Sequence, residues 1–189
     1  LEFRRVLFRS VLWSAILASL PDARLLLVAL GGDAPDVQAS IRNRFNNLAS
    51  DSSVAHRVDI AGRRPLQQFL HMFNEVDIAL DPFPYGGGTT SLHTLWMGVP
   101  IVTLEGNSEL ARSTSGMMIG CGLESLVARN EKQYLDTAVH LATDLHHLDK
   151  LRKSIRPRLS ASILGNAESV TRSLEDAYRM IWSEYRSEE

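Results

Sequence analysis

The sequence predicts a doubly wound α/β fold, in which helices cover both faces of a parallel sheet. Short apolar runs alternate along the chain with segments of helical periodicity, which is typical of strand–helix–strand units. The run at residues 24–30 ("RLLLVAL") is almost wholly apolar, as expected for a strand buried on both faces of such a sheet. Three consecutive glycines, Gly86 to Gly88, follow a later predicted strand. Ligands of these sheets bind beyond the carboxyl ends of the strands, so the glycines stand where a binding site is expected.

Each element follows from periodicity and its end signals. A helical pattern at residues 11–20 comes first, and Pro21 ends it. Apolar, strand-like runs occupy residues 24–30, 57–62, 76–81, 100–104 and 125–128. Helical patterns occupy residues 36–49, 65–75, 90–97, 109–119, 131–145, 148–160 and 168–185. Right-handed crossovers then join the parallel strands, and the last helices form a C-terminal tail.

The core of this fold is expected to include large apolar side chains from the helices. In the helix at 65–75 the residues expected to face inward are Leu66, Phe69, Leu70 and Phe73. Trp96 and Trp182 are also expected in the core.

Composition describes an ordinary globular protein of one domain or slightly more, with 189 residues, 44% hydrophobic and 22% charged. The net charge of −2 gives no electrostatic reason to expect nucleic acid or an anionic membrane as a partner. A single cysteine, Cys121, rules out an internal disulfide and agrees with a reducing, cytoplasmic setting. No apolar run reaches the roughly 20 residues of a membrane span.

Residues 1–10 ("LEFRRVLFRS") are Arg-rich and contain no initiator methionine. An amphipathic targeting segment would have this composition, but the stretch has no small-residue cleavage site. We interpret residues 11–189 as one domain with a C-terminal helical tail, part of a larger protein. Residues 1–10 are treated as a segment of doubtful origin, and no functional expectation rests on them.

The glycine run needs a reason, because glycines are costly in backbone entropy. Without a Cβ, Gly86, Gly87 and Gly88 let backbone N–H groups approach a bulky anion closely. Thr89 and Thr90 then open a helix, and either hydroxyl is expected to cap it. The positive end of that helix suits a phosphate or diphosphate, which we favour over a ligand-free turn. No lysine follows as in a P-loop, and the pattern is not GxGxxG, so a dinucleotide reductase is not expected.

The stretch "DIALDPFPYGGGTTSLHTLWMGVPIVTLEG" resembles the donor-binding region of the O-linked N-acetylglucosamine (O-GlcNAc) transferase family. The likeness continues through "LVARNEKQYLDTAVHLATDLHHLDKLRKSIRPRL" and "TRSLEDAYRMIW", and covers roughly residues 12–182. The resemblance implies a GT-B glycosyltransferase with two Rossmann-like domains, of which this chain is the second. The first domain, with the catalytic histidine, and tetratricopeptide repeats would precede it, so no catalytic residue is assigned in this chain.

The same resemblance implies an activity. Family members transfer N-acetylglucosamine from UDP-GlcNAc to Ser or Thr hydroxyls of proteins, with inversion and without an obligatory metal or other cofactor. A UDP-sugar and a protein acceptor are therefore the expected partners. By resemblance, Gly88, Thr89 and Thr90, with Gly87 beside them, match the motif that holds the diphosphate. Arg64 and Pro65 match the loop whose backbone pairs with the uracil edge.

Two positions depart from the family pattern. His93 falls where members usually have an acid that bonds the ribose hydroxyls; imidazole also bonds a hydroxyl, but it has fewer acceptor atoms. Phe69 stands where many members have a histidine near the diphosphate, and His71 lies two residues away. The family's donor-binding lysine would lie ahead of Trp13, where Arg4 is the nearest cation.

These departures keep two alternatives open. One is a non-catalytic nucleotide-binding or scaffolding module. This alternative would be favoured if His93→Glu restored activity to an otherwise inactive full-length parent. The other is a related transferase with a different sugar or acceptor, such as glucose onto asparagine.

Other side chains were weighed for a role at the site. Asp81 ends a strand beside the glycines, where it either orients the loop or simply forms a turn. His140 and His147 share a helix face, but no acid or cysteine completes a ligand set, so no metal site is expected.

Overall fold

A computed structural model of the chain describes residues 2–48 and 54–187, with side chains from Arg9 onward. The first half contains α1 (Glu2–Ser19), β1 (Leu25–Val28), α2 (Pro35–Leu48), η1 (Val54–Arg57), β2 (Val58–Ala61), α3 (Leu66–Met72) and η2 (Phe73–Glu75). The second half contains β3 (Ala79–Leu80), α4 (Thr89–Trp96), β4 (Ile101–Leu104), α5 (Glu109–Gly120), η3 (Glu124–Leu126), β5 (Val127–Ala128), α6 (Glu131–Thr143), α7 (Leu145–Ala161), η4 (Ile163–Gly165) and α8 (Ala167–Ser187).

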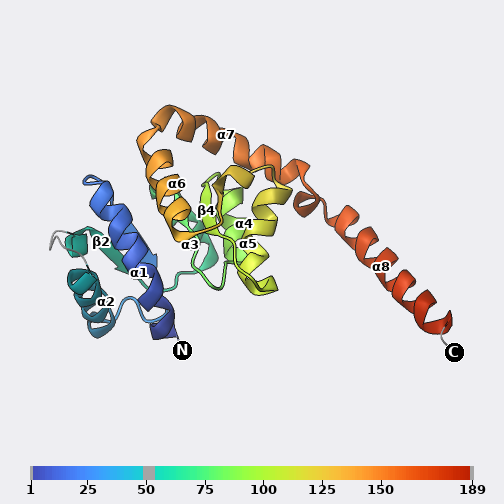
Figure 1. Cartoon of the computed structure of the whole chain (residues 1–189), viewed down its shortest axis with the longest axis horizontal. Helices are drawn as coiled ribbons and strands as arrows, with labels where there is room; N and C mark the ends of the chain where they lie inside the picture. The colour runs from blue at the N-terminus through green and yellow to red at the C-terminus, as the bar shows by residue number, and fades with distance from the viewer. Residues whose placement is uncertain (1, 49–53, 188–189) are drawn as a thin grey trace.

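All the strands pair in parallel, which confirms the predicted α/β class. β1 pairs with β2, with Leu25 opposite Val58. β3, β4 and β5 form a second ladder in that order. Helices α1 and α2 lie beside β1 and β2, and α4 and α5 lie beside the β3–β4–β5 ladder (Figure 1). Each predicted strand is present, although shorter than predicted, and the 125–128 stretch begins with a 3₁₀ turn before β5.

The core is centred on β4. Ile101, Val102 and Thr103 are all buried there, and α6, whose Tyr134 is fully buried, packs against the strand. α7 crosses the top of this part of the molecule (Figure 1). Its Arg156 Nε donates to the carbonyl of Trp96 at the end of α4, at 2.5 Å. α7 thus contacts the C-terminal end of α4, opposite the end that follows the glycines.

Four core assignments differ from the structure. β1 is not buried on both faces, because Leu25, Leu26 and Leu27 are only half-buried and Val28 is exposed. Leu66, at the first turn of α3, is also exposed. Trp96 is 50% exposed, since it packs under the guanidinium of Arg156 rather than into the core. Trp182 is 62% exposed on α8, where it stacks on Tyr185.

The start of the chain is more structured than the sequence indicated. α1 is continuous from Glu2, and Arg9 and Ser10 are buried in it. The Arg9 Nε donates to the carbonyl of Phe83 at 2.7 Å, so this arginine supports the loop after β3. The origin of residues 1–10 stays a matter of prediction. In the part of the chain that the structure describes, no helix has the length and apolar character needed to cross a membrane.

The C-terminal helix α8 projects away from the rest of the molecule (Figure 1). Throughout its described length none of its residues is buried. Its ion pairs, such as Arg172 with Glu168, join residues of the helix itself. Burial is what makes a helix contribute to the stability of a fold, so α8 contributes little here.

Deleting residues 167–189 should therefore change the free energy of unfolding of the rest by less than about 0.5 kcal/mol. Urea denaturation of the truncated and full chains measures this difference. As a control, a deletion that also removes α7, with its buried Leu148, Leu151, Ile155 and Leu159, should prevent stable folding. A large stability loss on removing α8 alone would contradict its isolation.

Candidate functional site

The glycine loop lies at the carboxyl end of β3, as predicted. Asp81 follows the strand, the loop runs through Gly86 to Gly88, and α4 begins at Thr89. Gly88, Thr89 and Thr90 are all exposed to solvent. A Cβ built on Gly88 would meet no protein atom within 4 Å, so this part of the loop faces open space. The start of α4 is therefore accessible and is not plugged by side chains.

The first turn of α4 differs from the prediction in its cap. Gly88 occupies the N-cap position, and no side chain caps the helix in the described structure, so neither threonine hydroxyl serves as the cap. By contrast, α5 is capped by Ser108 and α6 by Asn130. A glycine at the cap leaves the N–H groups of the first helical turn without a side-chain acceptor. Those donors and the positive end of the helix are what an anion requires.

Asp81 holds the loop from below. Its carboxylate is 6% exposed and accepts hydrogen bonds from the Gly87 N–H at 2.9 Å, the Thr103 hydroxyl at 2.8 Å and the Thr114 hydroxyl at 3.1 Å. Burial raises the pKa of Asp81, and these three hydrogen bonds oppose the rise. Of the two roles weighed for Asp81, the structure supports orientation of the loop, because one of its oxygens binds the Gly87 amide directly.

His93 and Phe69, the two departures from the family pattern, lie together. Their ring centroids are 6.3 Å apart in an edge-to-face arrangement, and Phe69 packs in the same way on Phe73 at 5.0 Å. The pair joins α3 to α4 one turn into α4. His71 is exposed, and its ring nitrogen pairs with Asn74 in η2, so it does not replace the missing donor.

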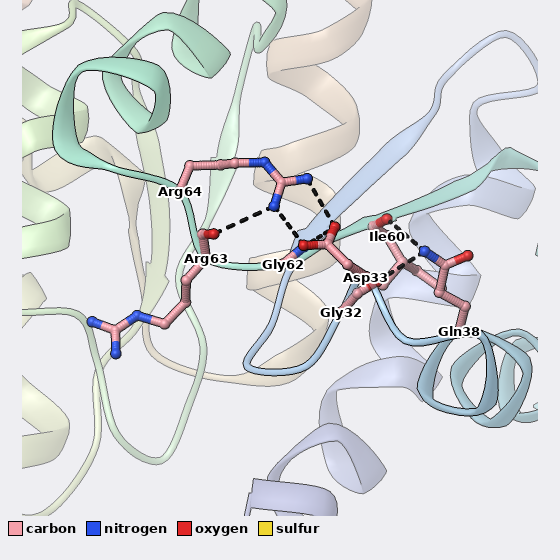
Figure 2. Close-up of polar contacts among 7 residues, drawn as sticks. All are labelled: Gly32, Asp33, Gln38, Ile60, Gly62, Arg63 and Arg64. Carbon is pink, nitrogen blue, oxygen red and sulfur yellow. Dashed lines mark hydrogen bonds and ion pairs between the residues drawn. The ribbon is translucent and has the colours of Figure 1, made fainter.

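The loop that contains Arg64 and Pro65 follows β2 at the same kind of strand end. The Arg64 guanidinium makes a two-pronged contact with Asp33, at 2.6 and 2.8 Å, and the Gly62 N–H donates to the same carboxylate at 3.0 Å (Figure 2). Hydrogen bonds from Arg64 and then from Gly62 lower the pKa of Asp33 to about 2. The carboxylate therefore stays ionised throughout the neutral range, and the pair stays formed.

This pairing has a consequence for the loop. The Arg64 side chain is occupied by Asp33, whereas Arg63 points away from the pair (Figure 2). Proline has no N–H, and the Pro65 carbonyl accepts from the Phe69 N–H at 2.9 Å. The backbone of Arg64, rather than its guanidinium, is then the part of this segment that a ligand would meet. α3 begins directly after Pro65, and its Phe69 packs on His93 of α4. This contact connects the Arg64–Pro65 loop to the helix that follows the glycine loop.

Comparison with known proteins decides the family. The model of glycosyl transferase family 41 matches residues 10–174, which is most of the chain. The chain belongs to glycosyl transferase family 41. The site just described is therefore a site in a family 41 chain, and the predicted likeness to O-GlcNAc transferases is confirmed.

Individual family 41 relatives agree with this assignment. A tomato (Solanum lycopersicum) protein named as a probable UDP-N-acetylglucosamine–peptide N-acetylglucosaminyltransferase, SPINDLY, is 35% identical over 175 residues. The protein of the same name from Arabidopsis thaliana is 37% identical over 178 residues. Each alignment covers 92% of this chain but only 18% and 19% of the relatives, respectively. This family 41 chain therefore spans about a fifth of the length of the curated relatives it matches.

A solved family relative has the same fold. A point mutant of the O-GlcNAc transferase of Thermobaculum terrenum superposes with a TM-score of 0.84 at 38% sequence identity. The superposition covers 92% of this chain and 33% of the bacterial chain. The predicted architecture, the Rossmann-like second domain of a GT-B enzyme, agrees with this match.

The predicted site residues of the family 41 chain divide into two groups in space. Gly87, Gly88, Thr89 and Thr90 form one continuous rim at the start of α4, with His93 one turn further on. Arg64 and Pro65 lie at the end of the neighbouring segment, after β2. Their roles toward UDP stay predictions. The side chain of Arg4 lies outside the described residues.

Sequence reasoning missed three polar residues that shape this family 41 site. Asp33 pairs with Arg64, and the signal available in the sequence was an acid after the first predicted strand and an arginine after the second. Ser113 and Thr114 on α5 bond the carbonyl of Gly87, at 3.3 and 3.0 Å. Nothing in their local sequence signals this contact, because it joins residues 26 and 27 positions apart.

Proposed function

We propose that this chain is the UDP-sugar-binding part of a transferase that moves N-acetylglucosamine from UDP-GlcNAc to Ser or Thr hydroxyls of proteins. One observation carries the proposal: a family 41 chain presents an exposed helix start, capped by a glycine alone, at the carboxyl end of β3. The names of its relatives supply the donor and the peptide acceptor. The protein acceptor, the cytoplasmic setting and the absence of a required metal or cofactor belong to the same proposal.

In this proposal the diphosphate lies against the start of α4. The Gly88 N–H and the next N–H groups of the helix donate to its oxygens, together with the hydroxyls of Thr89 and Thr90. Negative charge grows on UDP as the bond to the sugar breaks, and these fixed donors stabilise it without reorganising. The residue that accepts the proton of the acceptor hydroxyl would lie outside residues 1–189.

The remaining contacts hold the nucleoside. The backbone of Arg64 and Pro65 would pair with the uracil edge, in a loop that Asp33 keeps in place through the Arg64 side chain. His93 would bond a ribose hydroxyl through a ring nitrogen while its ring packs on Phe69. In this proposal the chain holds the donor in a fixed orientation. Such positioning is one of the main sources of the rate acceleration by enzymes.

Isothermal titration of the purified chain with UDP tests the proposal. We expect saturable heat with a dissociation constant of about 0.1–1 mM, or about −4 to −5.5 kcal/mol, since the start of α4 is open to solvent. Uridine should bind at least about tenfold more weakly, because it lacks the diphosphate that the α4 donors recognise. Circular dichroism on the same sample shows that the chain is folded. A folded sample that gives no heat with millimolar UDP would overturn the site assignment.

A further inference from the structure

The peptide group between Gly87 and Gly88 is held by α5, a helix that makes no contact with UDP in the proposed function. Its carbonyl oxygen, that of Gly87, lies 3.0 Å from the Thr114 hydroxyl and 3.3 Å from the Ser113 hydroxyl. Each hydroxyl shares its single proton with a second acceptor, Asp81 at 3.1 Å for Thr114 and the Leu110 carbonyl at 3.2 Å for Ser113. Both hydroxyls come from α5, whereas the loop itself joins β3 to α4. On the other side of the same residue, the Gly87 N–H donates to Asp81 at 2.9 Å. Gly87 is thus fixed at both its donor and its acceptor.

The planar geometry of the peptide group fixes the direction of the Gly88 N–H. In a planar trans peptide the C=O of one residue and the N–H of the next point in opposite directions. Because the Gly87 C=O points at the α5 hydroxyls, the Gly88 N–H points away from α5. Gly88 is itself exposed, so its N–H, on the side away from α5, is available to an anion at the start of α4.

The anchor is rigid because it is buried. Thr114 is 1% exposed, and its hydroxyl also lies 3.2 Å from the hydroxyl of Ser91, which is itself buried on α4. A side chain held by several partners inside the protein loses little freedom when a ligand binds. A donor aimed before the ligand arrives avoids the cost of ordering it on binding.

We propose that Ser113 and Thr114 are positioning residues that aim the Gly88 N–H at the diphosphate of the donor. The inference rests on the proposed function and deepens it, because it assigns the diphosphate contact to a donor that α5 controls. Neither hydroxyl touches the ligand; both act through the Gly87–Gly88 peptide.

Three variants of the full chain test the inference. Thr114→Val keeps the shape of the side chain and removes its hydroxyl, and with it the contacts to both Gly87 and Asp81. Ser113→Ala removes the second hydroxyl and leaves Asp81 untouched, and a double variant removes both hydroxyls. We expect the double variant to bind UDP about tenfold more weakly, while uridine affinity, followed by NMR shift titration, stays unchanged. Thr114→Ser, which keeps the hydroxyl, should restore most of the affinity. Ser115→Ala is the matched control, because among the described residues its buried hydroxyl donates to the Arg112 carbonyl within α5 and does not contact the glycine loop.

A second measurement needs no ligand. The Gly87 amide hydrogen, protected by Asp81, should exchange with solvent about tenfold faster in the double variant, because the peptide is then free to swing. Equal losses for UDP and uridine, or an unchanged UDP affinity together with unchanged Gly87 exchange, would overturn the inference and leave the proposed function standing. If the unmodified chain binds no UDP, the proposed function fails instead. The anchoring by α5 is tested independently of UDP, because an unchanged exchange rate of the Gly87 amide in the double variant would overturn it.

Discussion

Replacing Tyr134 with alanine is expected to lower the free energy of unfolding by about 3–5 kcal/mol, a large part of the stability of a domain this size. Tyr134 is fully buried on α6 and packs edge-to-face on Phe83, with ring centroids 5.7 Å apart. Its hydroxyl accepts from the Trp13 indole at 3.3 Å and donates to the Asp81 carbonyl at 3.2 Å. The substitution therefore opens a cavity between α1, α6 and the loop after β3. Chemical denaturation monitored by circular dichroism measures the change.

Two further variants separate packing from hydrogen bonding at this position. Tyr134→Phe keeps the ring but leaves the Trp13 indole without its acceptor, and should cost about 1–2 kcal/mol. Tyr185→Ala removes an exposed ring on α8 and should stay within about 0.5 kcal/mol of the unmodified chain. A loss of 1 kcal/mol or less for Tyr134→Ala would show that Tyr134 does not join these three segments in solution.

Replacing Gly87 with alanine is expected to weaken UDP binding at least tenfold, by displacing the loop rather than by unfolding the chain. The new Cβ would stand 2.3 Å from the hydroxyl oxygen of Ser91, closer than any real contact. Ser91 is buried and bonded to Thr114, so it does not move aside easily. The loop must shift instead, and the Gly88 N–H loses its aim. Isothermal titration with UDP measures the loss, and thermal unfolding shows whether the fold is kept.

The steric explanation predicts its own rescue. The other Ser91 atoms near the new Cβ lie at 3.4 and 3.5 Å, which is ordinary contact. Adding Ser91→Ala to Gly87→Ala removes the colliding oxygen, so the double variant should recover most of the UDP affinity. Gly116→Ala, on α5 in open space, should bind UDP normally and be slightly more stable, since alanine favours helix. If the double variant binds no better than Gly87→Ala alone, the collision with Ser91 is not the cause.

Much of the fold was predictable because its signals are local. Alternating apolar runs and helical patterns placed the strands and most helices to within a few residues, although α1 begins at Glu2, nine residues before the predicted start. The glycine run after residues 76–81 identified the rim of the sheet. The errors came from burial, which depends on neighbours distant in sequence. Trp96 looks like a core residue by type, yet Arg156, 60 residues later, covers it instead.

The sequence by itself determined the family, the parallel α/β class and the place of the candidate site, because a glycine-rich turn between a strand and a helix has few structural solutions. Only the tertiary structure decided how that turn is held. Asp81 from the end of β3 and the Ser113 and Thr114 hydroxyls from α5 converge on Gly87, and Asp33 secures Arg64 across two loops. These contacts join residues brought together by the packing of helices on strands, and no local pattern encodes their distances. The aim of each backbone donor depends on those distances.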